Sequence, residues 1–282
     1  MIDRLAIVGL GLLGGSVAKA ARARLLAREI VAVGRSAGRL EPARRDGTVD
    51  RIGTDLASGL AGADFCVLAT PVATLEALLP AVWQAVSADA LLTDVGSTKT
   101  RIVAAAERLR RSRPLRFIGS HPMAGSERSG YGVARADLFE GATVILTPTE
   151  QSDAGGLRRV GEFWEALGAR LVRLDPVVHD RAMAAVSHLP HLVADALVDS
   201  VVRMDPGFLE VAARGFKDTT RIAASSPAVW REIFQDNRPV LAEALAAFRK
   251  SLDHLEGVIT AADGAALERE LERIKQVRER LG

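Results

Sequence analysis

The sequence predicts an α/β fold, in which an N-terminal, doubly wound and mainly parallel sheet is followed by an all-helical domain. Through roughly the first 175 residues, short apolar runs alternate with longer stretches of helical periodicity, as in parallel sheets covered by helices on both faces. After Asp175 and Pro176 the strand-like runs stop, and Ala, Leu, Glu and Arg at helical spacing dominate to the end. We therefore expect two domains, at residues 1–176 and 177–282.

The expected strands are short, apolar and mostly β-branched, as strands buried on both faces tend to be. They lie at Leu5–Gly9, Ile30–Val33, Asp64–Ala69, Ala90–Val95, Arg116–Gly119, Thr143–Thr147 and Arg170–Leu174. The helices expected between them lie at Gly14–Ala27, Val72–Val86, Thr98–Arg111 and Ala154–Leu167. The second domain is expected to contain helices at Leu192–Val202, Val240–Val258 and Ala265–Arg280. Because these helices carry more apolar surface than about 100 residues readily bury, we expect a homodimer formed through them.

Composition narrows the class of protein. The 37 basic and 35 acidic residues are mixed along the chain and leave a net charge of +2, with no run typical of a nucleic-acid surface. No segment reaches the roughly 20 apolar residues of a membrane helix, so we expect a cytoplasmic protein with no nucleic-acid or membrane partner. The single cysteine, Cys66, lies in an apolar run and is expected to be a buried packing residue.

A glycine-rich turn, GLGLLG at residues 9–14, follows the first strand and opens a helix. In this setting Gly9 permits a tight turn, Gly11 lets a pyrophosphate approach the backbone, and Gly14 lets the helix pack close to the strand. The N–H groups of the first helical turn, at Leu12 and Leu13, offer a positive dipole end to phosphates. The sequence therefore predicts a Rossmann-type site for a nicotinamide dinucleotide.

The residues after the second strand bear on the choice of dinucleotide. An acidic residue there usually binds the ribose 2′-hydroxyl of NAD, but this chain has Gly34, Arg35 and Ser36. No acid would repel a 2′-phosphate, and Arg35 and Ser36 could bind one, unless Arg35 is simply an exposed loop residue. This favours NADP, with NAD as the open alternative. Thr70 and Pro71 complete the expected cofactor-binding residues.

Two polar segments follow later strands. Ser97, in DVGSTK at residues 94–99, is expected either to face a ligand at the carboxyl edge of the sheet, or to cap the helix expected from Thr98, or both. His121, in HPMAGSE at residues 121–127, is expected at the same edge. A histidine exchanges a proton near neutral pH, which suits deprotonation of an alcohol while a hydride leaves.

A third segment, SHLPH at residues 187–191, places His188 and His191 three positions apart, where they could share a helix face. A metal ion would need a third ligand. Neither His179 nor His254 stands at a recognisable ligand spacing, so we expect no metal site.

Arg221, in GFKDTTR at residues 215–221, offers a planar donor fork that matches a carboxylate. Asp218, three residues earlier, could orient this arginine. The alternative is that the two residues form an ordinary surface ion pair.

Taken in order, these segments resemble the prephenate/arogenate (cyclohexadienyl) dehydrogenase family of tyrosine biosynthesis. The matching segments are GLGLLGGS at 9–16, DVGSTK at 94–99, HPMAGSE at 121–127, SHLPH at 187–191, GFKDTTRIA at 215–223 and PAVWREIF at 227–234. The resemblance implies an oxidative decarboxylation of prephenate or arogenate, giving 4-hydroxyphenylpyruvate or tyrosine. In that reaction a hydride passes from C4 of the cyclohexadienol to NAD(P)+ while the ring carboxylate leaves as CO2.

The resemblance also implies residue roles. The histidine matching His121 hydrogen-bonds the C4 hydroxyl and promotes hydride loss, and the serine matching Ser97 helps to hold it. The arginine matching Arg221 binds a substrate carboxylate. The other implied members of the substrate pocket are His191, Ser126, and the acids Glu127 and Asp218 of the ionic network around the arginine.

The sequence leaves two other functions open. A β-hydroxyacid dehydrogenase shares the domain organisation but would use a lysine of the helical domain, for which Lys217 is the candidate. A non-catalytic NAD(P)H-sensing protein would need the fold without a convergent polar site. No regulatory domain is expected after Gly282, so any inhibition by tyrosine is expected at the active site.

Overall fold

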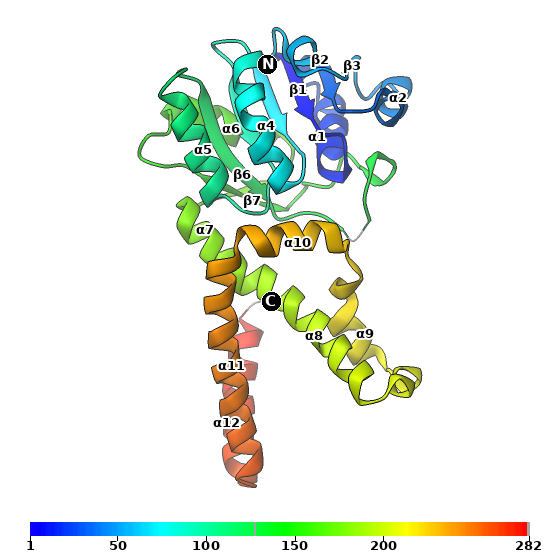
Figure 1. Cartoon of the computed structure of the whole chain (residues 1–282), viewed down its shortest axis with the longest axis vertical. Coiled ribbons are helices and arrows are strands. Elements are labelled where there is room, and N and C mark those ends of the chain that lie inside the picture. Colours follow the sequence, from blue (N-terminus) through cyan, green and yellow to red (C-terminus); the bar gives the residue numbers. More distant parts are fainter. Residues whose placement is uncertain (127, 281–282) are drawn as a thin grey trace.

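The computed structural model, which describes residues 1–126 and 128–280, confirms the predicted fold class (Figure 1). One sheet runs in the order β3-β2-β1-β4-β5-β6-β7-β8. All neighbouring strands are parallel except β6 and β7. The strands are β1 (Ile2–Val8), β2 (Ala27–Val33), β3 (Arg51–Gly53), β4 (Phe65–Leu68), β5 (Leu91–Asp94), β6 (Arg116–Pro122), β7 (Thr143–Thr147) and β8 (Arg170–Arg173).

The chain order reverses between β1 and β4, and ligands of such sheets bind beyond the carboxyl ends of the strands at this point. The sequence prediction missed β3, because three residues with a single isoleucine show no strand periodicity. It also began β2 too late, at Ile30. Two of the three missed residues, Arg28 and Glu29, are charged and lie at the amino end of the sheet, where Glu29 pairs with Arg4 at 2.5 Å.

Helices cover both faces of the sheet. They are α1 (Leu12–Ala23), α2 (Ala37–Arg45), α3 (Leu56–Leu60), α4 (Val72–Ala85), α5 (Thr100–Arg110) and α6 (Ala154–Ala166). Helix α1 ends four residues earlier than expected, and Leu25, with a φ of +53°, lies in the turn that leads to β2.

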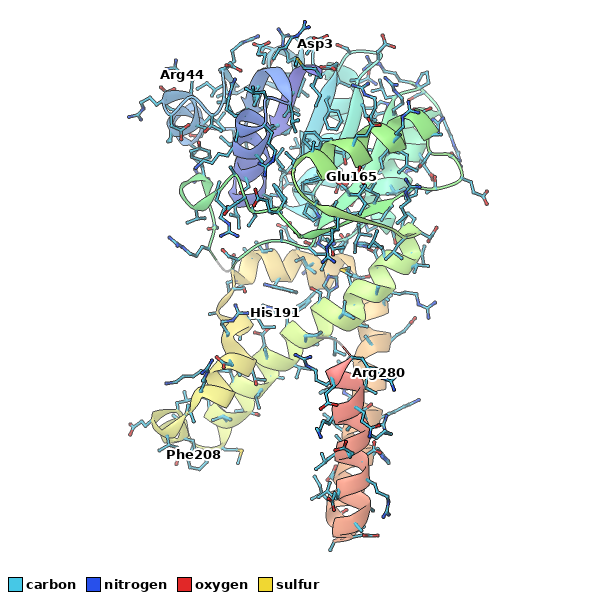
Figure 2. The ribbon with its side chains drawn as sticks, turned by 180° about the vertical axis from the view of Figure 1, so that it is seen from behind. Asp3, Arg44, Glu165, His191, Phe208 and Arg280 are labelled. Carbon is cyan, nitrogen blue, oxygen red and sulfur yellow. The ribbon has the colours of Figure 1, made fainter. Side chains whose placement is uncertain are left out.

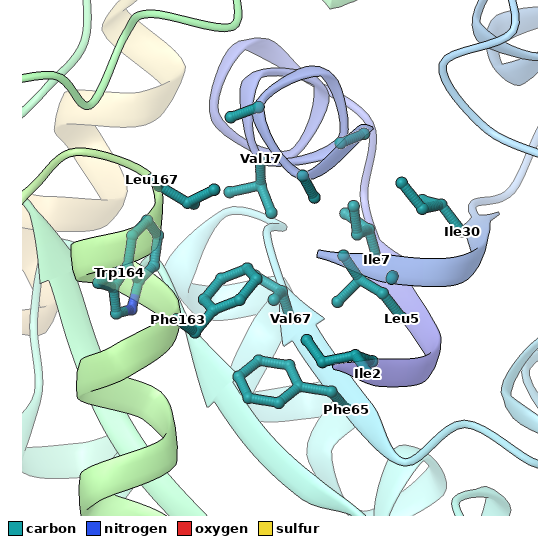
Figure 3. Packing of buried hydrophobic residues seen from close by; sticks show 14 of the residues in the cluster. Ile2, Leu5, Ile7, Val17, Ile30, Phe65, Val67, Phe163, Trp164 and Leu167 are labelled. Atoms are coloured by element: carbon teal, nitrogen blue, oxygen red, sulfur yellow. The ribbon is translucent and has the colours of Figure 1, made fainter. Parts of the chain in front are cut away.

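Two apolar clusters hold these layers together. On one face α1 and α6 pack on the sheet, with the rings of Phe65 and Phe163 4.7 Å apart between centroids (Figure 3). On the other face α3, α4 and α5 bury a second cluster around Trp83. Cys66 belongs to this second cluster and is fully buried, as expected, and burial raises the pKa of its thiol to about 12.

Every described element after β8 is helical. The elements are α7 (Pro176–Met183), a π-helical turn (Ala184–His188), α8 (Leu189–Met204), α9 (Arg214–Thr220), α10 (Pro227–Asp236), α11 (Arg238–Thr260) and α12 (Gly264–Glu279), with 3-10 turns at Pro206–Val211 and Arg221–Ala224. A further 3-10 turn, Tyr131–Val133, lies between β6 and β7. Helix α10 lies beneath the sheet, while α8 with α9, and α11 with α12, form two arms that extend away from it (Figures 1 and 2).

The arms bury few of their own apolar residues. No residue of α12 is buried, and α8 buries only His191 and Ala194. Large apolar side chains exposed on the arms include Val202, Met204, Phe208, Leu252, Ile259, Leu271, Ile274 and Val277. Across the described part of the chain, no helix is both long and apolar enough to cross a membrane.

Candidate active site

The glycine turn has the geometry that a dinucleotide phosphate requires. Gly9 has a φ of +96°, and an added Cβ would lie 2.7 Å from the Ala69 carbonyl oxygen. At Gly14 an added Cβ would lie 2.0 Å from the Gly9 carbonyl oxygen, so only glycine allows this approach of helix and strand. A Cβ at Gly11 would meet nothing within 4 Å. Gly11 is also the N-cap of α1 and offers no side chain to its free N–H groups, so the turn fits a pyrophosphate.

The loops after β2 and β4 lie at the same carboxyl edge. The N–H of Gly34 donates to the Gly53 carbonyl at 3.0 Å. Arg35 is exposed and forms no ion pair with a described residue, and Ser36 is the exposed N-cap of α2 without a side-chain cap bond. Thr70 is half-buried and Pro71 exposed where β4 leads into α4.

Beneath the site lies a buried charge network that the sequence reasoning missed. The side chains of Lys99 and Asp94 are both fully buried and form an ion pair. The Lys99 ammonium also donates to the Ser120 carbonyl at 3.0 Å. Asp94 further accepts from the N–H groups of Gly96 at 2.8 Å and Ser120 at 3.1 Å. The network ties the carboxyl ends of β5 and β6 together just below His121.

His121 lies at the end of β6, as predicted, and is 8% exposed. Its Nδ1 is 2.9 Å from Nε2 of His179, which projects from α7. His179 is fully buried, and its Nδ1 is 2.8 Å from Oδ1 of Asp180. Nε2 of His121 has no hydrogen-bond partner among the described residues and is not one of the buried unpartnered atoms, so it faces the open side of the site.

The structure corrects the capping role expected for Ser97. Helix α5 begins at Thr100, and its N-terminal N–H groups are capped from the other domain. Asp180 accepts from the N–H of Lys99 at 2.8 Å and of Thr100 at 2.9 Å. Ser97 precedes this helix by too many residues to cap it. Its side chain is partly exposed and forms no hydrogen bond with a described residue, which leaves the hydroxyl available to a ligand.

Burial sets the protonation of the buried histidines. It lowers the pKa of His121 well below the usual value of 6.5, and the nearby His179, Lys99 and His188 lower it further. Burial also lowers the pKa of His179, although its contact with Asp180 opposes this shift. The pKa of His188 falls to about 4, mainly through burial. These imidazoles are therefore neutral at physiological pH.

The histidines of the SHLPH segment lie on the π-helical turn and the first turn of α8. His191 is labelled in Figure 2. Its ring stacks on that of Trp230 from α10, with centroids 3.5 Å apart. Nδ1 of His191 and Nε2 of His188 are buried and have no hydrogen-bond partner in the described part of the chain. Nδ1 of His188 lies 3.2 Å from the Asn237 amide. The two rings thus have free nitrogen atoms where the two domains meet.

The three remaining substrate candidates that the structure describes, at positions 126, 218 and 221, are exposed. Arg221 is exposed in the turn after α9. Asp218 was expected to orient Arg221, but its ion pair joins it to Arg214 at 3.2 Å, because these residues lie one helical turn apart in α9. Ser126 is exposed and accepts from the N–H of Arg128 at 3.1 Å. Glu127 lies outside the described residues.

With this geometry in place, the family can be identified. Residues 17–173 match the family model for the nucleotide-binding domain of prephenate dehydrogenase, and residues 175–273 match that for its dimerization domain. The chain belongs to the prephenate dehydrogenase family. It is therefore a dinucleotide-dependent oxidoreductase, as its glycine turn predicted.

Relatives span the chain. A prephenate dehydrogenase of Bacillus subtilis is 34% identical over 100% of this chain and 76% of its own length. A cyclohexadienyl dehydrogenase of Zymomonas mobilis is 31% identical over 98% of this chain and 94% of its own. The structure of Aquifex aeolicus prephenate dehydrogenase with hydroxyphenyl propionate and NAD+ has a TM-score of 0.93 and 35% identity, covering 100% of this chain and 99% of that one.

The fold is shared beyond the prephenate dehydrogenases. A 3-hydroxyisobutyrate dehydrogenase of Salmonella typhimurium has a TM-score of 0.62 at 12% identity, covering 94% of this chain and 99% of that one, which is a likeness of fold alone. Lys217, the residue on which a β-hydroxyacid dehydrogenase mechanism would depend, is exposed on α9. His121, by contrast, lies at the carboxyl end of β6, in the same sheet as β1, which leads into the dinucleotide turn.

Proposed function

We propose that this protein catalyses the oxidative decarboxylation of prephenate or arogenate with a nicotinamide dinucleotide. One observation carries the proposal: a neutral, buried histidine, His121, lies at the edge of the sheet that holds the glycine turn, and its Nε2 has no hydrogen-bond partner among the described residues. A neutral imidazole that faces the site can accept a hydrogen bond from a substrate hydroxyl. Full-length likeness to prephenate and cyclohexadienyl dehydrogenases supports the substrate class.

In the proposed chemistry this histidine is a hydrogen-bond acceptor for the substrate. When bound, the nicotinamide ring supplies the acceptor for the hydride that leaves C4 of the cyclohexadienol. His121 accepts the hydrogen bond of the C4 hydroxyl through Nε2 and so favours loss of that hydride. The bond from the ring to its carboxylate then breaks, CO2 departs, and the electron pair completes the aromatic ring. The hydroxyl proton stays with the phenolic product, and Ser97 helps to hold the hydroxyl against His121.

The substrate carries two anionic groups, and the proposed anchors suit them. Arg221 binds a carboxylate with its planar donor fork. His191, held flat against Trp230, borders the pocket from the helical domain. Ser126, Glu127 and Asp218 are proposed to complete the polar surround.

A substitution at His121 tests the function. Prephenate and arogenate are each assayed with NAD+ and NADP+, and at least one combination is expected to give product, CO2 and reduced cofactor. His121→Asn is expected to lower kcat by roughly 10²- to 10⁴-fold with a much smaller effect on substrate binding. Near-normal turnover by this variant, or failure of the wild-type protein with both substrates, would refute the proposal.

We further propose that NADP is the preferred cofactor. The support is local: Arg35 is exposed, has no described ion-pair partner, and stands where NAD enzymes carry an acid. A hydrogen bond to a 2′-phosphate contributes about 1.5 kcal/mol or more, which predicts a KM for NADP+ about tenfold higher in Arg35→Ala. Arg45→Ala, at the far end of α2, is the control. Equal effects of Arg35→Ala on NAD+ and NADP+ would refute this preference.

We also propose that the domains divide at Pro176 and that the second forms a homodimer. The support is the large exposed apolar side chains on the two arms, together with the match to a dimerization domain. Sedimentation equilibrium is expected to give twice the chain mass of 30.0 kDa.

If tyrosine inhibits the enzyme, it is expected to compete with substrate, so purely noncompetitive inhibition would contradict an effect at the active site.

A further inference from the structure

A histidine on α7, His179, contacts His121, and the next residue of α7, Asp180, contacts that histidine in turn. The proposed chemistry does not require either of them to touch substrate. The contacts form an unbroken chain. Nδ1 of His121 is 2.9 Å from Nε2 of His179, and Nδ1 of His179 is 2.8 Å from Oδ1 of Asp180. Both α7 residues are buried and belong to the helical domain, whereas His121 belongs to the sheet. The interface between the domains therefore lies next to the proposed hydrogen-bond acceptor of the substrate hydroxyl.

Asp180 determines which atom donates in each of these hydrogen bonds. Its carboxylate accepts from the N–H groups of Lys99 and Thr100, at 2.8 and 2.9 Å. Burial by itself would raise the pKa of Asp180, but the hydrogen bonds from His179, Thr100 and Lys99 lower it overall. The carboxylate is therefore ionised and can only accept. Nδ1 of His179 must accordingly carry a proton and donate it toward Oδ1.

The same logic passes to the next ring. A neutral imidazole has one N–H and one lone pair, so a proton on Nδ1 of His179 leaves the lone pair on its Nε2. That lone pair can only accept, and the atom facing it is Nδ1 of His121. Nδ1 of His121 must therefore donate, which leaves Nε2 of His121 with its lone pair exposed to the site. If His121 carried its proton on Nε2 instead, the lone pair on its Nδ1 would point at the lone pair on Nε2 of His179.

We propose that His179 and Asp180 are positioning residues that fix the proton of His121 on Nδ1 and so keep Nε2 as an acceptor. This inference rests on the proposed function, in which Nε2 accepts the substrate hydroxyl. Because Asp180 also caps α5, the correct tautomer depends on α7 seating against the sheet domain. Substrate would then meet a competent acceptor only when the two domains are correctly packed.

The tautomer can be measured without any turnover. In protein with ¹⁵N-labelled histidine, long-range ¹H–¹⁵N spectra at neutral pH distinguish a protonated ring nitrogen from a bare one, and His121→Asn and His179→Gln assign the signals among the five histidines. We expect His121 and His179 each to be protonated at Nδ1 and bare at Nε2. A proton on Nε2 of His121 in the wild-type protein would overturn the proposal, even if the enzyme turns over its substrate.

The kcat and KM values of two variants distinguish a positioning role of His179 from a merely structural one. A glutamine at 179 can accept from Nδ1 of His121 with its carbonyl and donate to Asp180 with its amide, whereas phenylalanine can do neither. We expect His179→Phe to lower kcat roughly 10- to 100-fold with KM within about threefold of the wild type, and His179→Gln to recover most of kcat. His254→Phe, whose ring is 60% exposed on α11, is the control for histidine replacement.

The outcomes are distinct. Wild-type kcat in His179→Phe, or a loss in His179→Gln equal to that in His179→Phe at matched Tm, would overturn the positioning role. If His179→Phe does not fold, the wild-type tautomer and the His179→Gln rates still decide. If the wild-type protein turns over neither prephenate nor arogenate, the proposed function fails, while the measured tautomer still tests the hydrogen-bond chain.

Discussion

Two glycines of the dinucleotide turn are expected to respond in opposite ways to the same added methyl group. In Gly14→Ala the new Cβ would lie 2.0 Å from the Gly9 carbonyl oxygen and 2.9 Å from the Ala69 Cβ. Neither neighbour is the end of a flexible side chain, so α1 must move away from β1. Overpacking of this kind costs about 1–3 kcal/mol. For a domain of this size, that corresponds to a Tm roughly 2–12 °C lower.

Gly11→Ala adds the same methyl group where it meets nothing within 4 Å, at a φ of −84° that alanine adopts freely. Stability is expected to change by less than about 0.5 kcal/mol. The methyl group would, however, occupy the space through which a pyrophosphate approaches the backbone. Weakening one charged hydrogen bond costs about 1.5–3 kcal/mol, so the Kd for the cofactor is expected to rise roughly 10- to 150-fold.

The assay pairs thermal unfolding without ligand with titration calorimetry of NAD+ and NADP+. Gly264→Ala, at the start of α12, is the matched control, because an added Cβ there also meets nothing within 4 Å. Wild-type cofactor affinity in Gly11→Ala would refute the placement of the phosphate at this turn. An unchanged Tm in Gly14→Ala would refute the packing argument.

The other predictions concern the buried charges and the pH response. Lys99→Met leaves the Asp94 carboxylate buried without its cation and is expected to destabilise by about 3–5 kcal/mol in urea unfolding, whereas the exposed control Arg101→Met should cost under about 1 kcal/mol. The pKa of Asp180 is lowered in the folded state. Its carboxylate therefore contributes fully to the free energy of unfolding above about pH 4, and this contribution is lost as the pH falls through the folded pKa. Asp180→Asn should lower the free energy of unfolding by about 1–3 kcal/mol near neutral pH and by less at lower pH. His121 acts neutral and its pKa is lowered, so the acid limb of kcat/KM is expected below about pH 6.5, and a limb above that value would contradict the assignment.

Local patterns in the sequence were sufficient for the fold class and the dinucleotide turn. Apolar runs of strand length that alternate with helical periodicity require a covered parallel sheet, because each element must bury its apolar face against the next. The three glycines are interpretable in sequence because their constraint acts within a few residues of chain. His121 was predicted at the sheet edge for a similar reason, since residues that directly follow a parallel strand lie at its carboxyl end.

Only the tertiary structure decided which groups surround His121. His179 is 58 residues away from His121 in the sequence, and Asp180 is 81 residues away from Lys99, whose N–H it accepts. No periodicity links positions so far apart. In the sequence, His179 had no ligand spacing and Lys99 was one letter of a motif, yet both are fully buried beside the site. The N-cap expected from Ser97 is supplied by another domain. Short-range spacing determines local structure, whereas the partners of a buried polar group depend on how the domains pack, and packing brings together residues that the chain keeps far apart.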